Sequence, residues 1–366
     1  MFTERLDRAR SEMQRQGVDA LLLSVGADLP YLTGYEAMAS ERLTMLVVPA
    51  DGRPQLVVPE LEAPRVTPRP DFDITPWGEL DDPIAKVHEI VGARSQIAFG
   101  ETTWARFLVD LIKADGNRTF RHAVEVMKPL RAVKTADEIE RLRAASHAVD
   151  RIAARLQAGE IPLVGQTEAA VSAELGRQIK EEGHSKVNFA IVAAGENAAS
   201  PHHHAGERVI QADEGVLCDF GGTMYGDDGI GYCSDITRCV WTGTPPPEFV
   251  ELYDVLHEAQ VASVKAATVG TPAEEVDRVG RAIITDAGYG EYFIHRTGHG
   301  IGIEAHEEPY IVEGNSDPLV AGNAFSVEPG IYVPGTWGAR LEDIVVAAAD
   351  GPDSLNLVDH QLAQIG

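Results

Sequence analysis

The sequence has few cysteines and no long apolar run. Its three cysteines among 366 residues form an odd set, which argues against the disulfide framework that small secreted domains use. No apolar run approaches the roughly 20 residues needed to span a bilayer. The first ten residues read as a charged amphipathic helix rather than as a signal peptide. These absences predict a cytoplasmic protein that has no membrane partner.

Basic residues are also scarce. The chain has 57 acidic and 31 basic residues, which gives a net charge of -26. A surface of that sign repels phosphate backbones and anionic membranes. The composition therefore excludes nucleic acid as an expected partner, while the hydrophobic fraction of 44% is that of an ordinary globular protein.

The length allows two or three domains, and we place one boundary in a short basic connector that contains Pro129. Residues 1–127 read as a small α/β domain without a catalytic cluster. Its expected helices cover 3–16, 83–91 and 103–114, and its expected strands cover 18–25, 43–49, 55–59, 96–100 and 120–126.

Residues 128–366 read as a second, larger domain. Thr135 and Glu138 form a capping box that opens a long amphipathic helix. A second helix is expected over 167–182, and two more are expected after 245 and after 271. Helix pairs thus alternate twice with groups of strands, which hints at an internal duplication.

Acidic residues stand in the strand-like runs of this second region. Asp219, Asp235 and Glu342 lie within runs 216–220, 232–241 and 340–347, and Glu328 ends the run 324–328. A carboxylate in an apolar strand costs several kcal/mol, roughly, unless it has a partner. Asp235 has two open interpretations at this point: a metal ligand, or a structural ion pair with Arg238 or Arg340.

One imidazole accompanies these acids. His299 stands in Gly-His-Gly-Ile-Gly, where the missing side chains let an imidazole approach a crowded centre. Carboxylates with one nitrogen donor favour Mn, Co, Fe or Zn, and the number of acids suggests two ions. The three cysteines lie beside the acidic strands, and buried apolar thiols are favoured there over metal ligands.

The ordered set of acids and histidine resembles a known family. The stretches Ser-Asp-Ile-Thr-Arg, His-Gly-Ile-Gly, Val-Glu-Pro-Gly-Ile-Tyr and Arg-Leu-Glu-Asp are similar to those of the pita-bread metallopeptidases, in the branch of prolidase and aminopeptidase P. The resemblance covers about residue 128 to the C-terminus. It implies an α+β protein, with a C-terminal pita-bread catalytic domain behind a smaller N-terminal α/β domain.

The resemblance also implies a site that holds two divalent ions, with Mn ahead of Co or Zn. Asp219 would bind one ion, His299 and Glu328 the other, and Asp235 and Glu342 would bridge them. A hydroxide between the ions would be the nucleophile, and Glu328 would shuttle the proton.

Four further residues match family positions around the substrate. His202, His295 and His306 would bind the scissile carbonyl and stabilise its developing negative charge, and Arg340 matches an arginine near the bridging ligand. His203 and His204 are expected to be structural.

The sequence departs from the family pattern at two places. The hairpin between Asp219 and Asp235 is about five residues longer than the commonest spacing, which lengthens its tip without moving the ligands. Many prolidases have an arginine for the dipeptide carboxylate where this chain has Tyr310. Strict specificity for dipeptides is therefore an open question.

The resulting hypothesis is an exopeptidase that cleaves the bond before proline, in short peptides with proline at the second position. Xaa-Pro dipeptidase and Xaa-Pro aminopeptidase are both consistent with the residues. The alternatives are a creatinase-like hydrolase that cleaves a small C–N bond without metals, and a binding module that has lost catalysis. The complete set of five metal ligands argues against both alternatives. The resemblance to the family also implies a homodimer.

Overall fold

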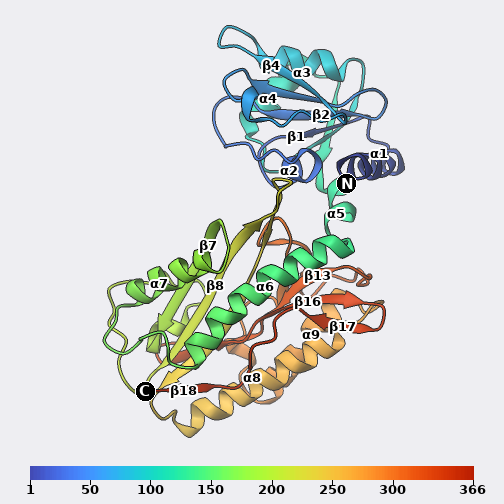
Figure 1. Cartoon of the computed structure of the whole chain (residues 1–366). Helices are drawn as coiled ribbons and strands as arrows, with labels where there is room; N and C mark the ends of the chain where they lie inside the picture. Colours follow the sequence, from blue (N-terminus) through green and yellow to red (C-terminus); the bar gives the residue numbers. More distant parts are fainter. The chain divides into compact units, whose positions relative to one another are not determined.

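The computed structural model describes residues 1–366 and divides into two compact units. The first unit comprises Met1–Arg131 together with Gly226–Ile230, and the second comprises Ala132–Tyr225 and Gly231–Gly366. Both units contain helices and sheets, which confirms the predicted α+β class (Figure 1). None of the helices is both long and apolar enough to cross a membrane.

The first unit is built on a six-stranded sheet with strand order β4-β3-β2-β1-β5-β6. Strand β1 lies inside the sheet, antiparallel to β2 and parallel to β5. All four residues of β1 are buried, because helices cover both faces of the sheet. The strands are β1 (Ala20–Leu23), β2 (Met45–Pro49), β3 (Gln55–Pro59), β4 (Asp73–Trp77), β5 (Gln96–Phe99) and β6 (Thr119–His122).

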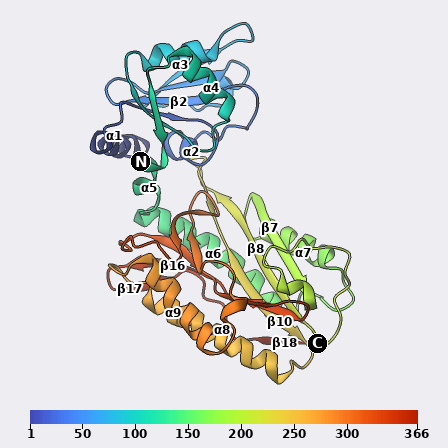
Figure 2. The ribbon, with the colours of Figure 1, turned by 180° about the vertical axis from the view of Figure 1, so that it is seen from behind.

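Five helices accompany this sheet: α1 (Phe2–Gln16), α2 (Asp28–Thr33), α3 (Pro83–Val91), α4 (Ala105–Ala114) and α5 (Val124–Arg131). Helices α3 and α4 pack on one face, and α1 and α2 lie on the other (Figures 1 and 2). The expected strand over 120–126 is wrong in its second half, because β6 ends at His122 and α5 begins at Val124. The expected connector, residues 128–134, is helical over its first four residues, because α5 contains Pro129 and ends at Arg131. Strand β4 and helix α2 were not predicted.

The second unit contains three sheets. One has the order β18-β10-β8-β7, with β9 paired to β8, the next has the order β12-β11-β13-β16-β17, and the third pairs β14 with β15. The first sheet consists of β7 (Lys186–Ala194), β8 (Gly215–Tyr225), β9 (Gly231–Cys233), β10 (Ile236–Thr242) and β18 (Ala363–Ile365). The other two consist of β11 (Gly298–Gly300), β12 (Glu307–Ile311), β13 (Ala324–Val327), β14 (Gly330–Val333), β15 (Trp337–Arg340), β16 (Asp343–Ala348) and β17 (Gly351–Ser354).

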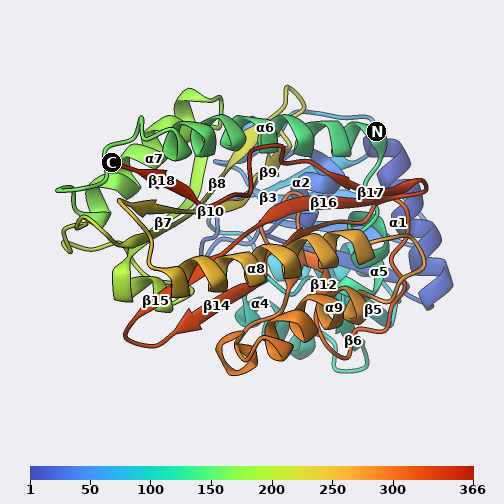
Figure 3. The ribbon, with the colours of Figure 1, turned by 90° about the horizontal axis from the view of Figure 1, so that it is seen from below.

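Two helix pairs enclose these strands. They are α6 (Ala136–Gln157) with α7 (Glu168–Glu181), and α8 (Pro247–Ala266) with α9 (Ala273–Asp286). Figure 3 shows α6 and α7 on one side of the strands and α8 and α9 on the other. The capping box of Thr135 and Glu138 is present at the start of α6, as predicted. Three short 3-10 helices complete the chain: η1 (Ala63–Arg65), η2 (Gly195–Ala199) and η3 (Gly290–Tyr292).

Side chains of β8 point alternately to opposite faces of the sheet. Val216, Cys218 and Phe220 point into the core that α6 and α7 cover. Successive side chains of a strand point to opposite faces, so Asp219 points away from that core and toward the other strands of the unit.

Candidate active site

All nine residues that the sequence singled out line one cavity of about 510 Å³ in the second unit. The cavity wall also contains Phe189, Ile191, Pro201 and Arg296. The nine residues are Asp219, Asp235, His299, Glu328, Glu342, His202, His295, His306 and Arg340. Residues up to 140 positions apart in the chain therefore meet in one place.

Asp219 comes from β8, whereas Asp235, which was expected on the neighbouring strand, lies just before β10. Asp219 lies in β8 opposite Thr237 of β10. The expected continuous strand over 232–241 is interrupted, because β9 ends at Cys233 and β10 begins at Ile236. Asp235 stands in this break, where the carbonyl of Ser234 lies 2.0 Å from the place that a Cβ on Gly221 would occupy. The glycine therefore allows the close approach that places Asp235.

His299 is the middle residue of the short strand β11. The Cβ of any other residue at Gly298 would lie 1.8 Å from the carbonyl oxygen of Ser326, and one at Gly300 would lie 2.3 Å from that of Glu308. The strands on both sides thus approach His299 more closely than a side chain at either neighbour would permit. Its backbone N–H donates to Ser326 Oγ at 3.0 Å.

The two glutamates stand at the ends of strands. Glu328 directly follows β13, and its Oε1 lies 3.1 Å from His299 Nε2. The expected strand over 340–347 is two strands, since β15 ends at Arg340 and β16 begins at Asp343. Glu342 lies between them, where its backbone bridges to Thr237 and its Oε2 accepts a hydrogen bond of 2.7 Å from Thr237 Oγ1.

The donor atoms fit a divalent cation. Ligand atoms of Asp235, His299 and Glu342 all lie within 4.8 Å of one another, and the three residues are buried. Three carboxylate oxygens, Asp219 Oδ1, Asp235 Oδ1 and Glu342 Oε1, are buried without a hydrogen-bond partner. Buried carboxylates of this kind need a compensating positive charge, and Lys or Arg supplies it to only one of the three. A metal ion matches this requirement.

The electrostatics agree with that requirement. Burial raises the pKa of Asp235 well above its usual value, and repulsion from Glu342 and Asp219 raises it further. Burial likewise raises the pKa of Glu342 and of Asp219. In Glu328 burial also acts to raise the pKa, but the hydrogen bond and charge of His299 outweigh it and bring the pKa to about 2.

Arg340 is the cation that partners Asp219. Its Nη2 lies 2.5 Å from Asp219 Oδ2, its Nη1 donates to the hydroxyl of Tyr332 at 2.8 Å, and its Nε donates to Thr237 Oγ1 at 3.1 Å. The alternative ion pair of Asp235 with Arg340 or Arg238 is therefore wrong, since Arg340 pairs with Asp219 and Arg238 pairs with Asp343.

Neutral histidines line the remaining wall. The ring centroids of His299 and His306 are 3.8 Å apart. Burial and the neighbouring His299 lower the pKa of His306 to about 4. Burial also lowers the pKa of His295, whose Nε2 contacts the Tyr332 hydroxyl at 2.8 Å. Tyr332 joins His295 to Arg340. No role was expected for this tyrosine, although it belongs to the Val-Glu-Pro-Gly-Ile-Tyr stretch.

A second residue that the sequence missed is Glu168, at the start of α7. This carboxylate is fully buried, and it accepts hydrogen bonds from Ala194 N, Asn197 Nδ2 and Gly206 N. His203 Nε2 lies 2.8 Å from the same carboxylate. Glu168 thus fastens both ends of the segment that carries His202, and the expectation of a structural role for His203 is met by this contact.

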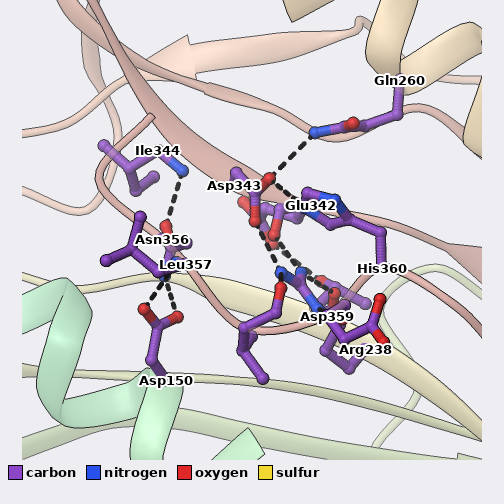
Figure 4. Close-up of polar contacts among 12 residues, drawn as sticks. Asp150, Arg238, Gln260, Glu342, Asp343, Ile344, Asn356, Leu357, Asp359 and His360 are labelled. Atoms are coloured by element: carbon purple, nitrogen blue, oxygen red, sulfur yellow. Dashed lines mark hydrogen bonds and ion pairs between the residues drawn. The ribbon is translucent and has the colours of Figure 1, made fainter. Parts of the chain in front are cut away.

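Behind Glu342 lies a buried polar network (Figure 4). Arg238 forms an ion pair of 2.7 Å with Asp343 and also donates to the backbone carbonyl of Glu342 at 2.7 Å. Gln260 and His360 contact the other oxygen of Asp343. The network holds the backbone that carries Glu342, and none of its four side chains lines the cavity.

The three cysteines are free, buried and absent from the cavity wall. Burial raises the pKa of each thiol, to about 11 for Cys233 and Cys239. They therefore pack as apolar groups, as predicted, and do not supply thiolate ligands.

Comparison with known proteins decides the family. The model of metallopeptidase family M24 matches residues 140–349, and that of the creatinase/prolidase N-terminal domain matches residues 5–133. The chain belongs to metallopeptidase family M24. A probable dipeptidase PepE of Mycobacterium tuberculosis strain H37Rv is 41% identical to this M24 chain over 367 residues, which cover 99% of the chain and 96% of the relative.

Solved structures agree with this assignment. The dipeptidase PepE from Mycobacterium ulcerans has a TM-score of 0.92 and 41% identity, and the match covers 100% of this chain and 98% of that one. A recombinant prolidase from Thermococcus sibiricus has a TM-score of 0.92 and 32% identity, with 100% and 99% covered. The Xaa-Pro dipeptidase from Bacillus anthracis has a TM-score of 0.88 and 30% identity, with 100% of both chains covered. The predicted family and the prediction of an enzyme are confirmed.

Proposed function

We propose that this M24 metallopeptidase binds two divalent ions and hydrolyses the Xaa-Pro bond of short peptides. The single observation that carries the proposal is the cavity in which five predicted ligands converge with three unpartnered carboxylate oxygens. The names of two similar proteins, a prolidase and an Xaa-Pro dipeptidase, support the proline specificity.

In this proposal Asp219 would bind one ion, His299 and Glu328 would bind the other, and Asp235 and Glu342 would contribute to both. Mn is the first candidate, followed by Co or Zn, because carboxylates with one imidazole suit these ions. When bound, such ions polarise a carbonyl group and lower the pKa of a water molecule to about 7.

The residues of the chain supply proton transfer and positioning. Glu328 would be ionised at neutral pH, because a bound cation favours the charged form of a carboxylate. It takes the proton of the attacking water and delivers it to the proline nitrogen, which carries no N–H and needs a proton in order to leave. His306 and His295 are neutral, so with His202 they can donate hydrogen bonds to the carbonyl oxygen as it gains negative charge.

The cavity fits a short peptide better than a folded protein. Its volume of about 510 Å³ lies within the range of small-ligand sites. Phe189, Ile191 and Pro201 form an apolar wall that suits a proline ring. A cavity of this size, lined by both ionic and apolar side chains, is consistent with an exopeptidase.

Hydrolysis of Ala-Pro and Ala-Pro-Ala by the Mn-loaded protein tests this function. We expect cleavage before proline, loss of cleavage with a chelator, and a loss of about 10²-fold or more in kcat for Glu328→Gln. Glu313→Gln, a substitution in the loop after β12, serves as a control that keeps the wild-type rate. Cleavage of neither peptide, or cleavage that survives the chelator, contradicts the proposal.

We also propose that the protein is cytoplasmic and forms a homodimer. Three free, buried thiols are consistent with a reducing compartment. Light scattering during gel filtration tests the dimer, and a mass near 39.5 kDa, that of one chain, would contradict it.

A further inference from the structure

Arg296 brings a positive charge without an acidic partner to the cavity wall. It is one of two arginines that line the cavity; the other, Arg340, is paired with Asp219. Arg296 forms no ion pair, although the chain has 57 acidic residues. Its contacts are a stack on the ring of Tyr310, 4.3 Å from the centroid, and His306 Nδ1 at 3.4 Å from its Nη2.

The backbone on both sides of Arg296 is fixed from helix α9. Arg281 Nη2 donates to the carbonyl of His295 at 2.7 Å, and Asp277 Oδ1 accepts from the backbone N–H of Thr297 at 2.9 Å. Arg281 and Asp277 form an ion pair with each other at 2.8 Å. The backbone that carries the half-buried Arg296 is therefore fixed, and the guanidinium already lies over Tyr310 without a ligand.

A guanidinium that stacks by its face keeps its in-plane N–H groups available. These groups form a fork that matches a carboxylate through two parallel hydrogen bonds. The tyrosine that replaces the expected arginine at position 310 thus supports a guanidinium supplied from the loop before β11. The ligand chemistry that fits Arg296 is a carboxylate of the substrate.

The distance from the predicted ligands decides which carboxylate this is. His306 contacts both Arg296 and, ring to ring at 3.8 Å, His299. Arg296 is therefore separated from a predicted ligand by one imidazole ring. In an extended peptide one residue spans about 3.5 Å, so the C-terminal carboxylate of a dipeptide lies one residue beyond the bond that is cut.

We propose that Arg296 binds the free C-terminal carboxylate of dipeptide substrates and thereby makes this enzyme a dipeptidase. The proposal rests on the proposed peptidase function and adds its specificity. An acidic side chain in front of proline carries the same chemical group, so the test separates the two sources of the carboxylate.

The test compares kcat/KM for Ala-Pro, Ala-Pro-amide and Asp-Pro-amide in the wild type and in Arg296→Met. We expect a loss of roughly 10- to 100-fold for Ala-Pro, as for the removal of a charge-assisted pair. Both amides should change less than about threefold, because neither has the C-terminal charge. Arg296→Lys should retain part of the preference for Ala-Pro, since lysine keeps the charge but lacks the fork.

Arg278→Met in α9 is the matched control, because this arginine is exposed and pairs only with Glu275. It should leave all three rates unchanged. Equal losses for Ala-Pro and Ala-Pro-amide in Arg296→Met, or no loss for either, would overturn the proposal. A loss confined to Asp-Pro-amide would overturn it as well, since Arg296 would then bind the side chain.

Ala-Ala and Ala-Ala-amide separate this proposal from the proposed function. If the wild type cleaves Ala-Ala but not Ala-Pro, the proline specificity fails, and the same comparison of acid and amide still tests Arg296. If it cleaves tripeptides faster than dipeptides in the wild type and in Arg296→Met alike, the inference about Arg296 fails while the proposed peptidase function stands.

Discussion

Replacing Glu168 with glutamine is expected to loosen the segment that carries His202. The carboxylate of Glu168 is fully buried. One of its oxygens accepts from Ala194 N at 2.9 Å and Asn197 Nδ2 at 3.0 Å. The other contacts His203 Nε2 at 2.8 Å and Gly206 N at 3.4 Å. Glutamine has one oxygen and one NH₂ group, so it must turn a donor toward one of these two pairs.

The magnitude follows from these contacts. Hydrogen bonds to a charged group contribute roughly 1.5–3 kcal/mol each. Glutamine keeps the bonds to Ala194 and Asn197 in a weaker, neutral form, and His203 can accept from its NH₂ group after a change of tautomer. We therefore expect a net loss of about 2–4 kcal/mol. At about 2–4 °C per kcal/mol this lowers Tm by roughly 4–16 °C.

Calorimetry and kinetics together test this reasoning. Glu168→Gln should also lower kcat/KM for Ala-Pro by about tenfold or more well below Tm, because a small displacement of a positioning group is costly. A double-mutant cycle with His203→Gln should give a coupling of roughly 1–3 kcal/mol. Glu181→Gln, an exposed residue at the other end of α7, is the control. A lowered Tm with an unchanged kcat/KM would refute the positioning role, and an unchanged Tm would refute the energetic argument.

Three further predictions concern the site and its support. The raised pKa values of Asp219, Asp235 and Glu342 mean that the metal-free native state binds more protons than the unfolded state. The free energy of unfolding of the chelated protein should therefore fall as pH rises from about 5 to 8. Thermal unfolding should show that Mn raises Tm more at pH 8 than at pH 5. A chelated protein that is more stable at pH 8 would contradict this prediction. Gly221→Ala should abolish metal binding in calorimetric titration, because the added Cβ would clash with the carbonyl of Ser234. Gly176→Ala is the control and should bind metal normally, because a Cβ there contacts only Val187, at 3.8 Å. Arg238→Met should lower the free energy of unfolding in urea by roughly 3–5 kcal/mol, because it leaves the buried Asp343 without its cation. A decrease below about 1 kcal/mol would show that Gln260 and His360 stabilise Asp343 without Arg238.

Local signals in the sequence predict several elements of the fold. The capping box at Thr135 and Glu138 marks the start of α6, because its two hydrogen bonds lie within one turn. The run 216–220 was expected as a strand and forms part of β8, and the fixed side-chain period of that strand explains why Asp219 points away from the apolar core. Glycines around His299 signalled close backbone approach, although the structure was needed to show that Ser326 and Glu308 supply it.

The errors came where tertiary contacts override local pattern. Arg340 to Ala347 reads as one apolar strand, yet the bridge between Glu342 and Thr237 interrupts it. The residues around Pro129 read as a connector because proline usually interrupts a helix, but α5 includes it. Glu168 shows no local signal beyond an acidic helix start, because its partners lie 26–38 positions away.

We propose that the buried acidic cluster is a two-ion centre that cleaves the bond before proline. Metal content and Ala-Pro hydrolysis, measured on the same samples of wild type and Asp235→Asn, test it most directly. We expect about two ions per wild-type chain, and activity that a chelator removes and Mn restores. Asp235→Asn should lose both the ions and the activity. Hydrolysis of Ala-Pro by wild-type protein that retains no metal would contradict the account.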